Sequence, residues 1–397
     1  MRRISVFGAT GSIGQNTLDL LVPGEVRVVA LTGGANVDRL AADARRFDAE
    51  IAVTAHEDRL PELRAALAGS GVEAAAGQCA LIEAADRPAD WTMSAIVGFA
   101  GLAPGLRSLR HGGTLALANK ESLVCAGPLL LGEAARHGAT VLPVDSEHSA
   151  VFQALAGQPM EAVEKIVITG SGGGLRDWPL DRLAHATPEE AGTHPNWDMG
   201  QRITIDSASM MNKAMELIET KEFFGMPPGG IEAVIHPQSL VHALVQFRDG
   251  AMMAHLGAPD MRHAIGYALN HPHRRPLPVE RLDLARIGRL DFSAPDPARY
   301  PAIALAHRVM AQGGLAGAAF NAAKEVALDL FLVRSIRFTD MAPLVERVLD
   351  AMDGAQALDN TADSLDMVQA ADAEARRRTR ELAPRGQDGQ RTSWMPA

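Results

Sequence analysis

Short apolar runs alternate with segments of helical periodicity over the first 145 residues, and this alternation limits the folds open to the chain. Strands are predicted at residues 4–7, 26–31, 51–53, 95–97, 114–117 and 140–144. Segments between them, such as 37–47 and 102–110, have helical periodicity. Strands that alternate with helices in this way pair in parallel. The pattern therefore predicts an α/β fold with a doubly wound, Rossmann-type parallel sheet.

A glycine-rich turn, Gly8-Ala9-Thr10-Gly11-Ser12-Ile13-Gly14, joins the first predicted strand to a helical run. Glycines at this spacing let the backbone approach a pyrophosphate closely, and the N–H groups at the start of the helix can bind it. The turn predicts a dinucleotide site, although a glycine-rich turn without a ligand would look the same.

The end of the second predicted strand indicates which dinucleotide would bind. NAD sites place an acidic residue there, where it binds the ribose 2′-hydroxyl. This chain instead has Gly33-Gly34-Ala35-Asn36, so no carboxylate would repel a 2′-phosphate. NADP is therefore favoured, with Arg39 as the nearest basic candidate.

Beyond residue 145 the alternation changes. An apolar run at 165–170 precedes a segment of little periodicity that extends to about residue 200, and such long segments inside a domain are usually functional. Further elements are predicted as a strand at 202–206, a helix at 207–224, a hairpin of 234–247 with 251–256, and helices at 302–311, 317–331, 341–351 and 364–380.

Two carboxylates follow the last strand of the first region. Asp145 and Glu147 lie two residues apart, so on an extended chain both would project to one face at the carboxyl end of the sheet. Because they offer only oxygen, they suit Mg²⁺ or Mn²⁺ better than zinc. The alternative is an N-capping Asp and a first-turn Glu on the next helix, and both interpretations stay open.

The predicted helix at 207–224 carries a third acidic candidate. Asn212, Lys213 and Glu216 are three or four residues apart and share one polar face. Glu216 could bind the same metal, while Asn212 and Lys213 could bind a substrate oxyanion or phosphate. A solvated Lys–Glu pair is the alternative.

Two loops contain groups suited to binding. Thr169-Gly170-Ser171-Gly172-Gly173-Gly174 is typical of a backbone anion site with a hydroxyl donor. His194-Pro195-Asn196-Trp197-Asp198-Met199-Gly200 could be a lid whose Trp excludes water. Lys120, after the strand at 114–117, would reach the same edge of the sheet. Each loop alone could equally be a flexible turn or a surface loop.

Charge and cysteine content limit the partners. The chain has 38 Lys+Arg against 48 Asp+Glu, a formal net charge of −10, so polyanionic nucleic acids and membrane surfaces are not expected partners. Cys79 and Cys125 lie far apart and predict no disulfide framework, which fits a reducing cytoplasm. We expect no signal peptide and no transmembrane helix, because no apolar run is long enough.

Taken together and in order, these motifs resemble the 1-deoxy-D-xylulose 5-phosphate reductoisomerase family. The matching segments are 8–14, 118–122, 143–148, 169–173, 194–197, 206–213, 236–239 and 321–323, so the resemblance covers nearly the whole chain. It implies a cytoplasmic homodimer that converts a small phosphorylated substrate, 1-deoxy-D-xylulose 5-phosphate, to 2-C-methyl-D-erythritol 4-phosphate in non-mevalonate isoprenoid biosynthesis. The implied cofactors are NADPH and a divalent metal, Mg²⁺ or Mn²⁺, with Co²⁺ as an alternative.

The resemblance also implies a role for each matching residue. The catalytic set would be Lys120 with the metal ligands Asp145, Glu147 and Glu216. The substrate would contact Lys120, Ser146, Glu147, Ser171, His194, Ser207, Asn212, Lys213 and Glu216. The cofactor would contact Thr10, Gly11, Ser12, Ile13, Gly34, Ala35, Asn36, Asn119, Lys120, Glu121 and Gly200, and the closing loop would include Trp197 and Met199.

The domain organisation expected from the pattern and the resemblance has five parts. They are an NADPH-binding domain at 1–145, an α+β catalytic domain with a dimer-forming sheet at 146–280, a linker at 281–305, a C-terminal helical domain at 306–384 and a flexible tail at 385–397. One departure affects the cofactor. Family members often have Lys where this chain has Ala35, so we expect NADPH to be preferred over NADH, with weaker discrimination.

Two other functions are compatible with the sequence. A plain NADP-dependent dehydrogenase would not need the three acidic residues and would remain active in EDTA. A dinucleotide-sensing binding protein would bind NADPH without turnover, but it leaves the acidic residues and the loop at 171–200 without a role.

Overall fold

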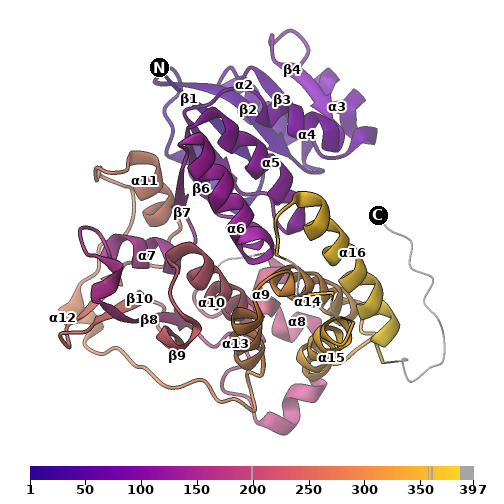
Figure 1. Cartoon of the computed structure of the whole chain (residues 1–397). Helices are drawn as coiled ribbons and strands as arrows, with labels where there is room; N and C mark the ends of the chain where they lie inside the picture. The colour runs from indigo at the N-terminus through magenta and orange to yellow at the C-terminus, as the bar shows by residue number, and fades with distance from the viewer. Residues whose placement is uncertain (198–199, 356, 359–360, 385–397) are drawn as a thin grey trace.

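A seven-stranded parallel sheet forms the N-terminal part of the computed structural model, which describes residues 1–197, 200–355, 357–358 and 361–384 (Figure 1). Its strands are β1 (Arg2–Phe7), β2 (Val26–Gly33), β3 (Ile51–Thr54), β4 (Glu73–Ala76), β5 (Trp91–Ser94), β6 (Thr114–Leu117) and β7 (Thr140–Pro143). The order β4-β3-β2-β1-β5-β6-β7 changes direction between β1 and β5, which is where ligands bind in such sheets. The predicted α/β fold is confirmed.

The sheet is connected by helices, as the alternation predicts. They are α1 (Ser12–Asp19), α2 (Val37–Arg46), α3 (Leu60–Ala66), α4 (Gly77–Ala85), α5 (Leu102–Ser108) and α6 (Lys120–His137). The structure differs from the sequence-based expectation at two places in this region. β4 is not predicted, because its three alanines have little β-propensity. The strand predicted at 95–97 is wrong, since the buried strand is β5, just before it.

A second sheet has four strands in the order β11-β10-β8-β9. These are β8 (Val163–Gly170), β9 (Ile231–Ile235), β10 (Val241–Phe247) and β11 (Met252–Leu256). The β10–β11 hairpin confirms the Asp-Gly turn prediction. The predicted start of that hairpin at 234 is wrong, because residues 234 and 235 belong to β9, which pairs in parallel with β8 on the other side.

The strand predicted at 202–206 is also wrong. These residues belong to α9 (Gln201–Ala208), in which the β-branched Thr204 and Ile205 are buried by tertiary packing, and packing overrides propensity. Met210 has a φ of 59°, so its left-handed backbone separates α9 from α10 (Met211–Phe224). The helix predicted at 207–224 is therefore two helices.

The C-terminal helical region is confirmed. It comprises α13 (Ala302–Gln312), α14 (Ala316–Leu332), α15 (Met341–Asp353) and α16 (Leu365–Leu382), which share one hydrophobic core with α10 and β8. A buried ion pair of 2.8 Å between Lys324 and Asp206 joins α14 to α9. In the part of the chain that the structure describes, no helix combines the length and hydropathy needed to span a membrane.

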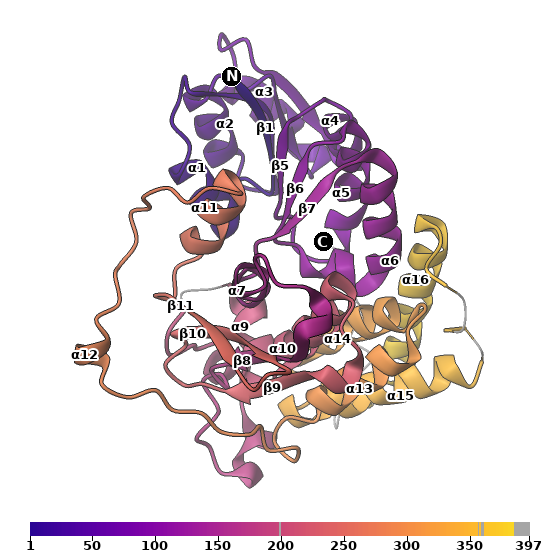
Figure 2. The same cartoon turned by 60° about the vertical axis from the view of Figure 1, so that its left-hand side comes forward.

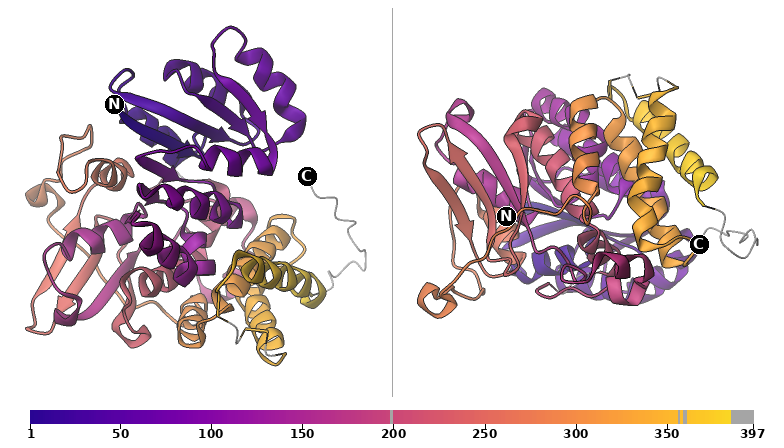
Figure 3. Two further views of the ribbon diagram at one scale, coloured as in Figure 1. Left: turned by 45° about the horizontal axis from the view of Figure 1, so that its top comes forward. Right: turned by 90° about the horizontal axis from the view of Figure 1, so that it is seen from below.

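One helix returns to the first sheet. After β11 the chain forms α11 (Arg262–Asn270), whose Ile265, Ala268 and Leu269 pack in the core of the N-terminal sheet. Trp91 of β5 donates a hydrogen bond of 3.1 Å to the carbonyl of Ala268. From α11 the chain runs out along a segment carrying α12 (Leu284–Ile287), which stands away from the body of the molecule (Figure 2). Figure 3 shows the N-terminal sheet separate from the second sheet and the C-terminal helices.

Candidate active site

Asp145 and Glu147 lie at the start of α7 (Ser146–Ala154), at the carboxyl end of β7. Asp145 is the N-cap, and its carboxylate accepts a hydrogen bond of 3.0 Å from the Ser146 N–H. Glu147 lies in the first turn. The capping alternative therefore describes the local structure, and the prediction that both residues extend from a strand is wrong. The two carboxylates still face one site, because a helix begins where the sheet ends.

A third carboxylate reaches this site from α10. Glu216 is completely buried, and the Asn212 side-chain amide donates to it at 2.5 Å. Asp145, Glu147 and Glu216 each offer an oxygen, and these atoms all lie within 4.8 Å of one another. Three convergent carboxylates without nitrogen or sulfur are a donor set for a hard dication. The residues therefore fit the expected metal ion.

Two buried lysines face these carboxylates. The Nζ of Lys120, at the N-terminus of α6, lies 2.5 Å from Asp145 Oδ2 and 3.1 Å from Glu216 Oε1. Lys213 Nζ lies 2.7 Å from Glu147 Oε1 and also contacts Glu216. Burial alone would lower the pKa of Lys120, but the carboxylates of Asp145 and Glu216 outweigh burial and raise it well above its usual value.

The three carboxylates are not fully balanced by the two lysines. Burial, followed by the repulsion of Glu147, raises the pKa of Glu216 above the usual value for a glutamate. An added dication would remove this repulsion and give the site a net positive charge. The site would then suit an anionic substrate, although the whole chain is acidic.

Two residues behind the cluster have no role in the sequence analysis. His148 and Glu219 are both buried, with 3.3 Å between His148 Nδ1 and Glu219 Oε2. His148 Nε2 lies 3.0 Å from the carbonyl of Glu216, so this pair supports the helix turn that carries the third carboxylate. A signal was present in the sequence, because Glu219 lies three residues after Glu216 and shares its helix face.

Ser171 and His194 form the next part of the site. The N–H groups of Asn196 and Trp197 donate to His194 Nδ1 at 3.1 and 3.0 Å, so this nitrogen carries no proton. The proton is then on Nε2, which lies 2.9 Å from Ser171 Oγ and donates to it. Burial lowers the pKa of His194, which favours this neutral form. The Ser171 hydroxyl hydrogen is left available to a ligand.

The glycine loop after β8 packs directly on α9. Gly173 has a φ of 70°, and a Cβ there would lie 2.4 Å from Ala208 Cα, so only glycine allows this approach. The same Cβ would lie 3.0 Å from Ser207 C, so the loop that contains Ser171 also packs against the backbone of Ser207. On the other side, a Cβ on Gly170 would lie 3.0 Å from Lys213 Cε. The predicted substrate residues thus come together from α7, α9, α10 and two loops.

The predicted loop lies beside this group. Trp197 is half-buried, and its ring centroid lies 6.3 Å from that of His242. His242 therefore packs as expected for a hairpin residue. Met199, the other predicted loop residue, lies outside the described residues.

The glycine-rich turn follows β1, next to the direction change in the sheet. α1 begins at Ser12 with Gly11 as its N-cap, so the first N–H groups of the helix have no side-chain cap. A Cβ on Gly14 would lie 2.2 Å from the Gly8 carbonyl oxygen, which explains the glycine there. Thr10 lies against Gly33 at the end of β2, so the turn touches the segment that contains Gly34, Ala35 and Asn36.

The other predicted cofactor residues come from different elements. Asn119 caps α6 and donates to the carbonyls of Ile96 and Gly98 at 2.8 and 2.9 Å, which fixes the loop after β5. Burial raises the pKa of Glu121, in the first turn of α6. Gly200 precedes α9 and is exposed.

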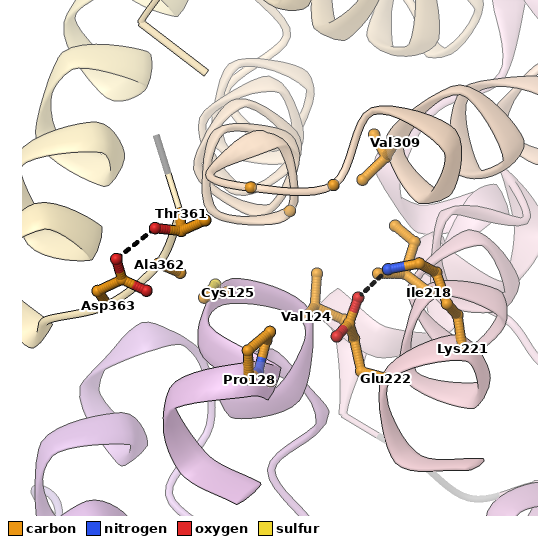
Figure 4. Close-up of a pocket in the computed structure, with 14 residues that line it drawn as sticks. Val124, Cys125, Pro128, Ile218, Lys221, Glu222, Val309, Thr361, Ala362 and Asp363 are labelled. Carbon is orange, nitrogen blue, oxygen red and sulfur yellow. Dashed lines mark hydrogen bonds and ion pairs between the residues drawn. The ribbon is translucent and has the colours of Figure 1, made fainter. Parts of the chain in front are cut away.

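A separate cavity of about 150 Å³ lies between α6, α10, α13 and α14 (Figure 4). Its walls include Cys125, an ion pair between Lys221 and Glu222, and a hydrogen bond from Thr361 to Asp363. None of its lining residues belongs to the carboxylate cluster, so it is distinct from the site described above.

Three family models match the chain. The model described as 1-deoxy-D-xylulose 5-phosphate reductoisomerase matches residues 4–127. That of the 1-deoxy-D-xylulose 5-phosphate reductoisomerase C-terminal domain matches 141–224, and that of the DXP reductoisomerase C-terminal domain matches 256–378.

Proteins of the same description are similar over their whole length. The 1-deoxy-D-xylulose 5-phosphate reductoisomerase of Jannaschia sp. (strain CCS1) is 70% identical over 377 residues, which cover 94% of this chain and 96% of that protein. The enzyme of Zymomonas mobilis, solved in complex with NADPH, has a TM-score of 0.90 and 46% identity, covering 96% of this chain and 99% of that one. A DOX-P reductoisomerase solved with NADPH, fosmidomycin and magnesium has a TM-score of 0.92 and 38% identity, covering 96% and 98%.

Proposed function

The chain belongs to the 1-deoxy-D-xylulose 5-phosphate reductoisomerase family, and we propose that the cluster of Lys120, Asp145, Glu147 and Glu216 is its active site. The chain converts 1-deoxy-D-xylulose 5-phosphate to 2-C-methyl-D-erythritol 4-phosphate, with NADPH and a divalent metal ion as cofactors. The observation that carries the site assignment is the convergence of three carboxylates and two lysines at the carboxyl edge of a dinucleotide-type sheet.

The metal ion is assigned to Asp145, Glu147 and Glu216. A bound dication stabilises negative charge that develops on adjacent substrate oxygens. Lys120 contacts the metal ligands Asp145 and Glu216. It is therefore placed to add a second positive charge near the substrate oxygens. Behind the metal ligands, the buried pair of His148 and Glu219 fixes the position of α7 relative to α10, the helices that carry Glu147 and Glu216.

The substrate is assigned to the groups in front of the metal ligands. Ser146 lies beside them, and its hydroxyl donates to Glu147 at 2.5 Å. The phosphate end is assigned to residues that offer hydroxyl, amide, imidazole or ammonium donors, namely Ser171, His194, Ser207, Asn212 and Lys213. Trp197, half-buried beside them, would exclude water when its loop closes.

NADPH is assigned to the turn at 8–14, the end of β2, and Asn119, Glu121 and Gly200. On this basis residues 1–145 form the NADPH-binding domain and 146–280 the catalytic domain. The linker at 281–305 then leads to the helical domain at 306–384. Because α11 packs on the first sheet, the catalytic domain also completes the hydrophobic core of the NADPH-binding domain.

The direct test is NADPH oxidation with 1-deoxy-D-xylulose 5-phosphate, with and without Mg²⁺ or Mn²⁺. We expect turnover only when metal and substrate are both present, because the carboxylates need the cation to stabilise charge on the substrate. Absorbance at the NADPH band measures the rate, and EDTA followed by added metal is the control for reversibility. Full activity in EDTA would instead support a plain dehydrogenase.

We also propose that the chain is a homodimer joined through its second sheet, in the cytoplasm. β11 is an edge strand, so one side of its backbone has no partner strand among the described residues. Its Met252 and Met253 are 52% and 44% exposed, although methionine is usually buried. Exposed apolar side chains on an unpaired edge are typical of a surface that pairs with a second copy of the same chain.

Introducing charge on this strand should dissociate the dimer. In the double variant Met252→Asp and Met253→Asp, like charges would face each other across the two-fold axis, and the apparent dissociation constant should rise by about 100-fold or more. Sedimentation equilibrium measures the change. Val333→Asp is the matched control, since Val333 is an exposed apolar residue at the end of α14, outside this sheet. An unchanged dimer in the double variant would place the interface elsewhere.

A further inference from the structure

The segment 33–36, where the 2′-phosphate of NADPH is expected, carries no charged side chain. The segment at the end of β2 has Ala35, which is exposed and uncharged. Arg39, the basic residue nearest in sequence, is already engaged, because its Nε lies 3.2 Å from Asp43 and its Nη2 donates to Gln15. Asp43, in α2, and Gln15, in α1, therefore hold the guanidinium between these two helices.

His56 approaches this segment from the loop after the neighbouring strand β3. β2 and β3 pair in parallel with Gly33 opposite Thr54, so the residues after both strands meet at one edge of the sheet. His56 Nε2 lies 4.0 Å from where a Cβ on Gly34 would be. The ring is exposed, and within the described part of the chain its nitrogens have no hydrogen-bond partner.

The loop that carries His56 is fixed to the cofactor segment. Thr54 Oγ1 donates a hydrogen bond of 2.9 Å to the Gly34 carbonyl, and the His56 N–H donates to the same hydroxyl at 3.3 Å. The next residue, Glu57, directs its carboxylate towards Gly77, where a Cβ would lie 2.6 Å from Oε1. An imidazole is therefore presented at the end of β2 while the nearby acid is turned away.

We propose that His56 is the specificity residue for the 2′-phosphate of NADPH in this chain, replacing the basic residue absent at position 35. The inference rests on the proposed function, since it takes NADPH as the cofactor. In a Rossmann-type sheet the adenosine ribose lies at the end of the second strand. An imidazole N–H at that point can donate to a phosphate oxygen, and its protonated form adds a charge.

Direct binding separates this role from catalysis. Calorimetry at fixed ionic strength would compare 2′,5′-ADP with 5′-AMP, which lacks the 2′-phosphate. We expect His56→Ala to weaken 2′,5′-ADP about tenfold, as for a hydrogen bond to a charged group, and to leave 5′-AMP unchanged. The kcat/KM ratio for NADPH over NADH should fall by the same factor. His273→Ala, at an exposed histidine just after α11, is the matched control.

A gain-of-function variant completes the test. Adding Ala35→Lys to His56→Ala should restore the preference for 2′,5′-ADP, because a lysine there supplies the missing charge at the same phosphate. Equal losses for both nucleotides, or no loss for either, would overturn the role of His56. If the wild-type protein shows no metal-dependent turnover of 1-deoxy-D-xylulose 5-phosphate, the proposed function fails, whatever the nucleotide binding shows.

Discussion

Glu216→Gln should lower kcat by about 10³-fold, as expected when a principal source of transition-state charge stabilisation is removed. Glutamine keeps the volume of the buried side chain but offers a neutral ligand, so the cation loses one of its three carboxylates. Titration with Mn²⁺, followed by electron paramagnetic resonance, should show that tight metal binding is lost in parallel with activity.

The matched control for this variant lies on the same helix. Glu222→Gln removes a carboxylate that faces the cavity between α6 and α10 and pairs with Lys221. Its activity and Mn²⁺ affinity should equal those of the wild type. Circular dichroism and thermal unfolding would show that both variants fold, which matters because removing one partner of a buried ion pair costs about 3–5 kcal/mol. Normal activity of folded Glu216→Gln would contradict the metal assignment.

Lys120→Met should lower kcat by about 10²–10³-fold, the loss expected on removing one preorganised charge from an active site. Its effect on the metal should be opposite to that of Glu216→Gln. In the structure Lys120 neutralises Asp145 and Glu216, so it competes with a cation for the same oxygens. Without it, the carboxylates repel one another more strongly and should bind Mn²⁺ at least as tightly as the wild type does.

These two measurements separate catalysis from metal binding. Kinetics give kcat, and a Mn²⁺ titration gives the metal affinity of the same preparation. Lys221→Met, which removes a lysine beside the separate cavity, is the control and should change neither value. If Lys120→Met lost metal affinity together with activity, Lys120 would be a structural support of the site and not a group that acts on the substrate.

The sequence predicts the parts of the site that depend on local order. The turn at 8–14 follows a strand and precedes a helix, so its position at the carboxyl edge follows from the fold class. The helical spacing of Asn212 and Glu216 likewise predicts their shared face, although the helix begins later than expected. These inferences succeed because each needs only neighbouring residues.

Other features depend on contacts between distant residues. Residues 202–206 have strand-like composition, but packing against the helical core makes them α9. The pairing of His148 with Glu219 joins two helices and cannot be derived from either one. His56 becomes a candidate only because β2 and β3 end side by side. The sequence places Asp145 directly after a predicted strand. Whether it ends that strand or caps the next helix depends on the backbone between β7 and α7.

The return of α11 to the first sheet means that the cofactor-binding part is not continuous in the chain. Ile265, Ala268 and Leu269 cover the same core as Ile4 and Val28, and they come after the whole second sheet. A fragment that stops at residue 145 would expose this core to water. During synthesis, the nucleotide-binding fold can be completed only after the catalytic segment has left the ribosome, so NADPH affinity should be gained late and together with the metal site.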